Sequence, residues 1–287
     1  MKIATSGNSE DSFFIALYNW SVLRQNEAET SMDKRRNKMR LRGRKGIREN
    51  LEEQVDLVVL EPNQHKGKWS ELFGNDHPIF VEFGMGKGQF ISQMSYKYPE
   101  FNFIGIDMYD ELVRRASEKA RNAWSQAEVE TPPNLKLALA NIEQIEDVFE
   151  PEELERIYLN FSDPWPKAKH ARRRLTHPRF LKKYKELLNT KGQIHFKTDS
   201  ETLFDFSLNA IADFGLQMTN ISLNLHRDGL NEEHVMTEYE QKFMGKGMNI
   251  HRVEVVVGEE ALREYQQMRL DKYKVREVSE ETGESQE

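Results

Sequence analysis

Glycines and a carboxylate stand where two apolar runs of the chain end. Gly84, Gly86 and Gly88 follow the run at 79–83, and Asp107 closes the next run, 21 residues after Gly86. Glycine lets a backbone turn sharply and approach a ligand closely, and an acidic residue about 20 positions further on is where a ribose hydroxyl pair is bound. This spacing indicates a site for a cofactor that contains a nucleoside.

Two further residues distinguish between nucleoside cofactors. A dinucleotide-binding turn needs a third small residue where this chain has Gln89. Glu82, at the end of the first run, would repel a pyrophosphate but would attract the ammonium and sulfonium charges of S-adenosyl-L-methionine. The alternative for Glu82 is an ion pair with a neighbour such as Lys87. We favour S-adenosyl-L-methionine as the cofactor and expect no metal.

A second group of reactive residues occurs in the segment 160–175, which reads NFSDPWPKAKHARRRL. Its prolines stiffen and direct the loop. Trp165 offers a flat face for stacking on a base, and Asp163 offers acceptors for ring or exocyclic N–H groups. In the alternative, Trp165 covers the core and Asp163 caps a turn. Because the segment adjoins the expected cofactor site, we favour the functional role.

Positive charge is concentrated in two stretches, although the net charge of the chain is −7. Residues 33–48 and residues 163–185 each contain nine lysines or arginines and one aspartate. Either stretch alone also fits a solvated face or a flexible arm. The second begins at Asp163, so we expect its side chains to bind phosphates and orient an RNA. Its cations nearest to Asp163 are Lys167, Lys169, Arg172, Arg173 and Arg174.

The composition fits a globular protein in a reducing compartment. The chain has 287 residues, of which 38% are hydrophobic and 31% are charged, and it has no cysteine. Disulfides and thiolate metal sites are therefore excluded, and the cytoplasm is the expected location. No apolar run approaches the roughly 20 residues that cross a bilayer, and the apolar patch at 13–23 lacks the features of a secretory signal. We therefore expect no membrane partner.

Strands that alternate with helices are expected to position these residues. Apolar runs predict seven strands, at 79–83, 101–107, 135–140, 156–161, 193–198, 216–225 and 250–257. Helical spacing and capping signals predict helices from residue 90 and at 110–127, 143–150, 176–189, 200–214 and 259–273. This order builds a mostly parallel sheet with helices on both faces. No convincing helix separates the last two strands, so at least one is expected to be antiparallel.

Several segments together resemble the bacterial tRNA (guanine-N7)-methyltransferase family. They are FGMGKGQF, IGID, LNFSDPWPKAKHARRRL, FKTD at 196–199 and TEYEQKF at 237–243, and the resemblance covers about residues 39–257. It implies an α/β, Rossmann-like class I methyltransferase fold with a seven-stranded, mostly parallel sheet and one antiparallel strand near the C-terminus. It also implies methyl transfer from S-adenosyl-L-methionine to N7 of a guanine in the tRNA variable loop, which forms 7-methylguanosine.

The resemblance implies roles for individual residues. It assigns to cofactor binding Glu82, Gly84, Gly86, Asp107, Asn141 and Asp163, and it makes Asp163 the catalytic aspartate. It assigns to the target nucleotide Lys167, Asp199, Thr237, Glu238, Tyr239 and Glu240. It assigns to the RNA the stretch Lys169, His170, Ala171, Arg172, Arg173 and Arg174. Asn141 stands where the family often has aspartate, and an amide can still hydrogen-bond an adenine ring.

The same reading divides the chain into four parts. We expect residues 1–38 to be a disordered or non-native extension and residues 39–75 to be a basic N-terminal arm. We expect residues 76–274 to form an S-adenosyl-L-methionine-dependent methyltransferase domain and residues 275–287 an acidic disordered tail. The favoured true start is Met39. The implied partner is tRNA, and the protein is expected to be a monomer or a homodimer.

Three other interpretations remain open. A methyltransferase that acts on another RNA, a protein or a small molecule would share the glycine turn, but for a protein or a small molecule the basic cluster would not be needed. A nicotinamide oxidoreductase is disfavoured by Glu82 and Gln89. A non-catalytic RNA-binding module is disfavoured because Glu82, Asp107 and Asp163 are all present.

Overall fold

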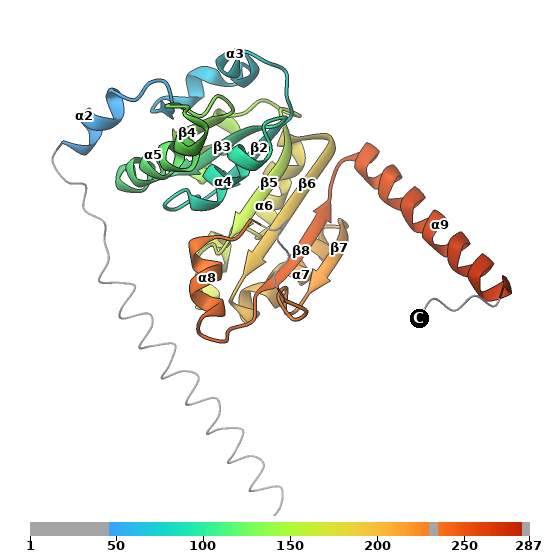
Figure 1. The fold of residues 1–287 in the computed structure, drawn as a ribbon. Helices are drawn as coiled ribbons and strands as arrows, with labels where there is room; N and C mark the ends of the chain where they lie inside the picture. Colours follow the sequence, from blue (N-terminus) through green and yellow to red (C-terminus); the bar gives the residue numbers. More distant parts are fainter. Residues whose placement is uncertain (1–45, 230–234, 283–287) are drawn as a thin grey trace, which may run out of the picture. The chain divides into compact units, whose positions relative to one another are not determined.

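The structure, a computed structural model, describes residues 46–229 and 235–282 (Figure 1). The extension predicted at 1–38 lies outside the described residues, as do the first residues of the basic arm and the last five residues of the chain. Among the described residues, no helix combines the length and the apolar character needed to cross a membrane.

An eight-stranded sheet, in the order β1-β4-β3-β2-β5-β6-β8-β7, forms the centre of the fold. Strands β1 to β6 pair in parallel, whereas β8 is antiparallel to both β6 and β7. The strands are β1 (Val58–Val59), β2 (Ile79–Phe83), β3 (Asn102–Asp107), β4 (Leu135–Leu139), β5 (Leu154–Asn160), β6 (Leu188–Thr198), β7 (Gln217–Ser222) and β8 (His251–Val256). The predicted α/β fold with an antiparallel strand near the C-terminus is confirmed.

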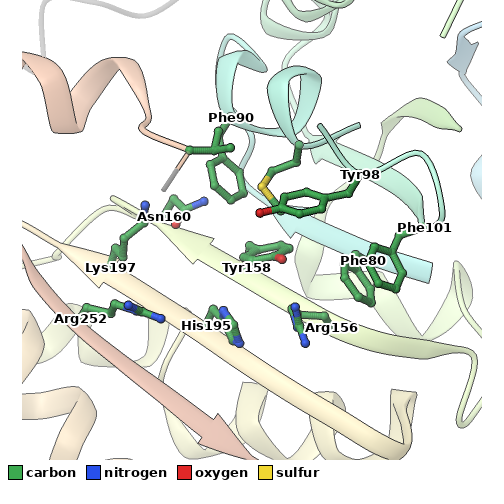
Figure 2. Close-up of a pocket in the computed structure, with 12 residues that line it drawn as sticks. Phe80, Phe90, Tyr98, Phe101, Arg156, Tyr158, Asn160, His195, Lys197 and Arg252 are labelled. Carbon is green, nitrogen blue, oxygen red and sulfur yellow. The ribbon is translucent and has the colours of Figure 1, made fainter. Parts of the chain in front are cut away.

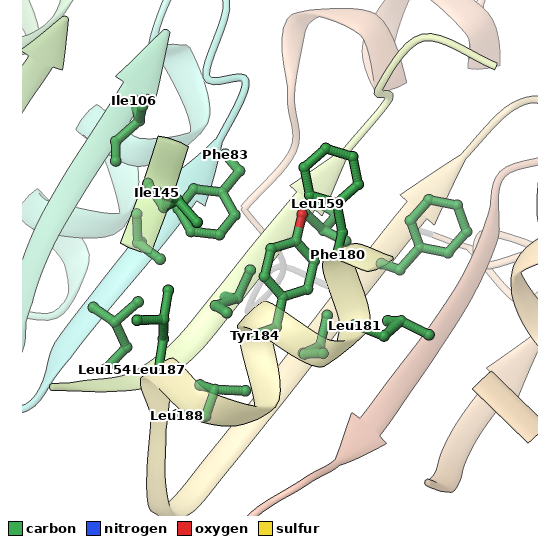
Figure 3. Packing of buried hydrophobic residues seen from close by; sticks show 14 of the residues in the cluster. Phe83, Ile106, Ile145, Leu154, Leu159, Phe180, Leu181, Tyr184, Leu187 and Leu188 are labelled. Carbon is green, nitrogen blue, oxygen red and sulfur yellow. The ribbon is translucent and has the colours of Figure 1, made fainter. Parts of the chain in front are cut away.

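Alternate residues of the strands point to opposite faces of the sheet, and helices cover both faces. On one face, Val81 and Phe83 pack with α6 (Pro178–Leu187) and α7 (Glu201–Asp213). Figure 3 shows Phe83 beside Tyr184 of α6, with ring centroids 5.3 Å apart. On the other face, Phe80 packs with α4 (Gln89–Lys97) and α5 (Asp110–Trp124). Burial of these apolar faces is the main force that holds the layers together.

The sheet has one strand more than the seven we predicted. The additional strand, β1, pairs with β4 at the edge of the sheet and lies in the segment that we assigned to an N-terminal arm. That segment also contains α2 (Ile47–Glu52), η1 (Pro62–His65) and α3 (Trp69–Phe73). Leu51 and Trp69 are fully buried, and the Trp69 indole donates to the Val148 carbonyl at 3.0 Å. A two-residue strand carries no periodicity, so only its tertiary pairing reveals it.

Two helices differ from the sequence prediction. The seven-residue helix α8 (Glu238–Met244) lies between the last two strands, where we predicted none. The last helix, α9 (Glu259–Thr282), continues into the segment that we expected to be a disordered tail. Its many lysines, arginines and glutamates are good helix formers, and we read their charge as a sign of disorder. The remaining single-turn elements are η2 (Ser125–Ala127), η3 (Ile142–Asp147) and η4 (Ala168–Arg173).

Candidate cofactor and RNA-binding site

The predicted site residues gather at the carboxyl edge of the parallel strands. The strand order reverses at β2, which has β3 on one side and β5 on the other, and such a switch point is where open α/β sheets bind ligands. The glycine turn follows β2, Asp107 ends β3, Asn141 follows β4, and Asp163 follows β5. The fold therefore brings together side chains from segments that are far apart in the sequence.

Glycine is required at the three positions of the turn for different structural reasons. All three have positive φ, at 74° for Gly84, 58° for Gly86 and 71° for Gly88, which disfavours any residue with a Cβ. A Cβ added at Gly84 or Gly86 would meet only open space, so the turn leaves room above it for a ligand. A Cβ at Gly88 would lie 2.5 Å from the Cβ of Ala116, so Gly88 lets α4 pack closely on α5.

Glu82 is buried at the end of β2, directly below the turn. Its Oε1 accepts a hydrogen bond of 2.9 Å from Asn160 Nδ2, and its Oε2 has no partner in the described part of the chain. Burial raises the pKa of Glu82 to about 8, although the Asn160 hydrogen bond and the charge of Lys197 act in the opposite direction. The alternative pairing with Lys87 is not formed, because Lys87 binds Glu238. A buried carboxylate oxygen with no partner fits a cationic ligand.

Asp107 is buried beside the same turn. Its two carboxylate oxygens accept backbone N–H groups, Oδ2 from Gly86 at 3.1 Å and Oδ1 from Tyr109 at 3.1 Å. Burial raises the pKa of Asp107 to about 6, and the nearby negative charge of Asp163 adds to the increase. Asp107 and Asp163 therefore belong to one electrostatic site, although one ends β3 and the other lies in the loop after β5.

Asn141 is exposed and caps η3. Its Oδ1 accepts the backbone N–H of Glu143 at 3.0 Å, which leaves the amide nitrogen as the group directed to other partners. The structure thus gives Asn141 a capping role that the sequence comparison did not suggest. An aspartate would cap in the same way, but it would supply no N–H donor.

The loop after β5 is held in shape by one arginine. Trp165 has a positive φ of 43°, an unusual conformation for a large residue. Arg174 donates to the carbonyls of Pro164 at 3.0 Å and Trp165 at 3.1 Å, and it lies over the ring of Phe206. Because its side chain is buried in these contacts, Arg174 supports the loop and does not present a charge to an RNA. The structure therefore argues against the role that the resemblance gave to Arg174.

The other cations of this loop face solvent. Lys167, Lys169, Arg172 and Arg173 are exposed, whereas His170 and Ala171 are half-buried within η4. Arg173 lies over the Trp165 ring at 4.8 Å, and His170 meets the same ring edge-on. Trp165 is thus half-buried against its own loop instead of covering the core. This arrangement places an exposed cationic surface next to Asp163.

The stretch 237–240 behaves differently from its expected role in nucleotide binding. Thr237 and Glu240 form a capping box at the start of α8. Glu240 is fully buried, where it accepts Lys197 Nζ at 2.8 Å and pairs with His226 Nε2 at 2.7 Å. Tyr239 is about half exposed and stacks near Phe161, with ring centroids 6.3 Å apart. Glu240 is therefore a structural anchor, and Tyr239 is the exposed residue of the stretch.

A pocket of about 250 Å³ opens between α4 and strands β5, β6 and β8. Figure 2 shows the rings of Phe90 and Tyr98 on one side and Tyr158, His195 and Lys197 on the sheet opposite them. The full lining is Phe80, Phe90, Met94, Tyr98, Phe101, Arg156, Tyr158, Asn160, His195, Lys197, Val235 and Arg252. We did not predict these residues from the sequence, although polar side chains at every second position of apolar strands were a visible signal.

Asp199 follows β6 and is half-buried at the same edge of the sheet, so the fold brings it near the site. Within the residues that the structure describes, no group of three or more histidine, aspartate or glutamate side chains is arranged to hold a metal ion.

Comparisons with known proteins agree with the class that this fold and site define, a Rossmann-like methyltransferase. The family model described as "Putative methyltransferase" matches residues 76–253. A tRNA (guanine-N(7)-)-methyltransferase of Bacillus licheniformis is 48% identical over 75% of this chain and 98% of its own length. Those of Bacillus subtilis and Streptococcus sanguinis are 45% and 46% identical, over 76% and 75% of this chain and 98% of each relative. This chain therefore belongs to the tRNA (guanine-N(7)-)-methyltransferase family.

Among solved structures, a 16S rRNA (adenine(1408)-N(1))-methyltransferase from Catenulisporales acidiphilia aligns with a TM-score of 0.48 at 17% identity, over 70% of this chain and 95% of that one. The fold assignment rests on the strand order and on the family membership instead.

Proposed function

We propose that this chain transfers a methyl group from S-adenosyl-L-methionine to N7 of a guanine in the variable loop of tRNA, and that it does so in the cytoplasm as a monomer or a homodimer. The observation that carries the proposal is the position of Asp163. This exposed carboxylate lies close enough to Asp107 to raise its pKa, and an exposed cationic surface follows it directly in the chain. The names of the relatives indicate which nucleobase we propose as the methyl acceptor, guanine at N7.

The residues present fit the proposed cofactor. Glu82 Oε2 is buried without a partner and would accept the cationic end of the molecule, while Asp107 would accept its ribose hydroxyls. The open space above Gly84 and Gly86 leaves room for the nucleoside. The bound cofactor would supply an electrophilic methyl group. The exposed amide nitrogen of Asn141 would donate to the adenine ring.

Guanine N7 carries a free lone pair and needs no deprotonation before it attacks a methyl group, so a strong base is unnecessary. The protein mainly has to align the base with the cofactor, which Lys167, Asp199 and the exposed part of the 237–240 stretch would do. Alkylation places positive charge on the base. Asp163, accepting a hydrogen bond from the guanine edge, would stabilise that charge as it forms.

The test is methylation of tRNA followed by digestion to nucleosides. Unmodified tRNA is incubated with the enzyme and with methyl-labelled cofactor, and the label should appear in 7-methylguanosine. A protein lysate and a ribosomal RNA serve as matched substrates. Label in another nucleoside, or in protein but not in tRNA, would show that the fold is used for a different substrate.

A further inference from the structure

The helix α8 is attached to the protein on two faces of different character. On its buried face, Glu240 is held by Lys197 and His226, and Phe243 packs beside Phe161 with ring centroids 5.9 Å apart. A seven-residue helix has little stability of its own, so these contacts set where it lies. They account for the position of α8 without any contribution from its other polar residues.

On its more exposed face, one carboxylate connects α8 to the glycine turn. Glu238 Oε2 accepts Lys87 Nζ at 3.0 Å, and Glu238 Oε1 binds Lys119 Nζ. Lys119 Nζ also donates to Gln89 Oε1 at 2.7 Å. Lys87 belongs to the glycine turn, Gln89 begins α4, and Lys119 belongs to α5. A single side chain on α8 therefore gathers three elements that surround the turn.

The turn needs such a fastening because it is built from glycines. Gly84, Gly86 and Gly88 all have positive φ, and a glycine-rich segment loses more conformational freedom on ordering than any other. Lys87 is the only residue between Gly86 and Gly88, and Asp107 already accepts the N–H of Gly86, so the Lys87 side chain is a second point at which this part of the turn is held. A turn that is ordered in advance binds its ligand at a lower entropic cost.

The ionisation state of Glu238 suits a residue that holds two lysines. Partial burial would raise its pKa, but the hydrogen bonds from Lys119 and Lys87 outweigh that effect and lower the pKa below its ordinary value. The carboxylate is therefore ionised at neutral pH and keeps both lysines bound. Each partner is partly exposed, with side-chain exposures of 42% for Lys87, 29% for Lys119 and 32% for Glu238, so the effect of the pairs is expected to be moderate.

We propose that Glu238 is a positioning residue for the cofactor: by holding Lys87 and Lys119, its carboxylate fixes the glycine turn in the conformation that receives S-adenosyl-L-methionine. The resemblance to the family assigned this residue to the target nucleotide instead. The inference rests on the cofactor named under the proposed function. It makes α8 a physical link between the nucleotide end and the cofactor end of the site.

The experiment measures cofactor binding without RNA by titration calorimetry. Glu238→Gln keeps the shape of the side chain and removes its charge, while Glu118→Gln removes the charge of an exposed glutamate on α5 that pairs with Arg114 and serves as the control. For Glu238→Gln we expect the Kd of S-adenosyl-L-methionine to rise about three- to tenfold, as two partly exposed ion pairs would give. The thermal midpoint should stay near its wild-type value.

S-adenosylhomocysteine, which lacks the sulfonium charge, separates two explanations. If Glu238 orders the turn, both ligands lose affinity by the same factor. If only S-adenosyl-L-methionine is weakened, Glu238 acts by attracting its charge and the proposal is wrong. A second variant, Lys119→Met, should add little to Glu238→Gln because the two residues act through one contact, and fully additive losses would also contradict the proposal.

One result would assign Glu238 to binding of the target nucleotide instead. In that case the cofactor Kd of Glu238→Gln is unchanged and the KM for tRNA rises instead. This outcome overturns the inference but leaves the proposed function intact. Failure of the wild-type protein to bind the cofactor at all would contradict the proposed function itself, so the two failures are distinguishable.

Discussion

At the scale of single residues, the surroundings of Glu82 disfavour its ionised form. Its carboxyl is fully buried, one of its oxygens has no partner in the described structure, and its pKa is raised to about 8 from an ordinary value of 4.5. The protein thus keeps a group that is more stable uncharged at the place where we propose that the cationic end of the cofactor binds. Such a conflict between stability and local chemistry is typical of functional sites.

This conflict predicts a pH dependence of cofactor binding. A cation stabilises the ionised form of Glu82, so the affinity for S-adenosyl-L-methionine should rise with pH between about 7 and 8 and then level off, with release of a proton on binding. Calorimetry in two buffers of different ionisation enthalpy measures that proton. For Glu82→Gln we expect weak binding without the rise. Equal proton release by the wild type and by this variant would assign the titration to another group.

The same pKa shift predicts that the stability of the unliganded protein falls as the pH rises, whereas its affinity for the cofactor increases. Because the pKa of Glu82 is higher in the folded than in the unfolded state, the folded state holds the proton between about pH 4.5 and 8, and the stability contributed by the protonated group is lost as the pH rises through that range. Glu82→Gln cannot ionise. The unliganded variant should therefore gain stability over the wild type as the pH increases, which thermal unfolding at pH 5 and pH 8 would measure.

At the scale of elements, the glycines of the turn differ in role: Gly88 is required for helix packing, whereas Gly84 and Gly86 leave open space for a ligand. Gly88→Ala places a Cβ 2.5 Å from Ala116 in a backbone with φ of 71°, so we expect a loss of about 2–4 kcal/mol in the free energy of unfolding. Gly86→Ala has a similar φ but open space, and should lose only about 1 kcal/mol while weakening cofactor binding. Equal losses in chemical denaturation would contradict this division.

The loop after β5 gives a second prediction at this scale. Arg174→Lys cannot donate to the carbonyls of both Pro164 and Trp165 with the planar geometry of a guanidinium. We expect it to lower stability by about 1–3 kcal/mol and to reduce kcat, because Asp163 loses its fixed position. The salt dependence of tRNA binding should be unchanged. A flatter salt dependence with normal stability would mean that Arg174 binds phosphate after all.

The elements that the sequence revealed are those with strong local patterns. The apolar runs of β2 to β6, the glycine turn and the clusters around Asp163 all follow from residue type and spacing. β1 was missed because two residues have no periodicity, and α8 was missed although Thr237 and Glu240 carry a capping-box signal. The roles of Arg174 and Glu240 could not be predicted, because exposed and buried charges look alike until tertiary contacts are known.

At the scale of the whole molecule, the net charge of −7 would repel an RNA, so binding must depend on a local surface. The exposed cations at 167–173 supply such a surface beside Asp163. We predict that Arg172→Ala weakens tRNA binding and lowers the slope of log K against log salt by about 1, with unchanged thermal stability. An unchanged slope would remove Arg172 from the RNA-binding surface.

The central claim is that Asp163 promotes methylation of guanine N7 in tRNA. The most direct measurement compares wild-type protein with Asp163→Asn, quantifying 7-methylguanosine in digested tRNA at saturating cofactor while cofactor Kd is measured separately. We predict that the wild type forms 7-methylguanosine and that the variant is about 10²–10³-fold slower, with cofactor affinity changed far less. Normal turnover with weak cofactor binding in the variant, or no 7-methylguanosine from the wild type with any tRNA, would contradict the account.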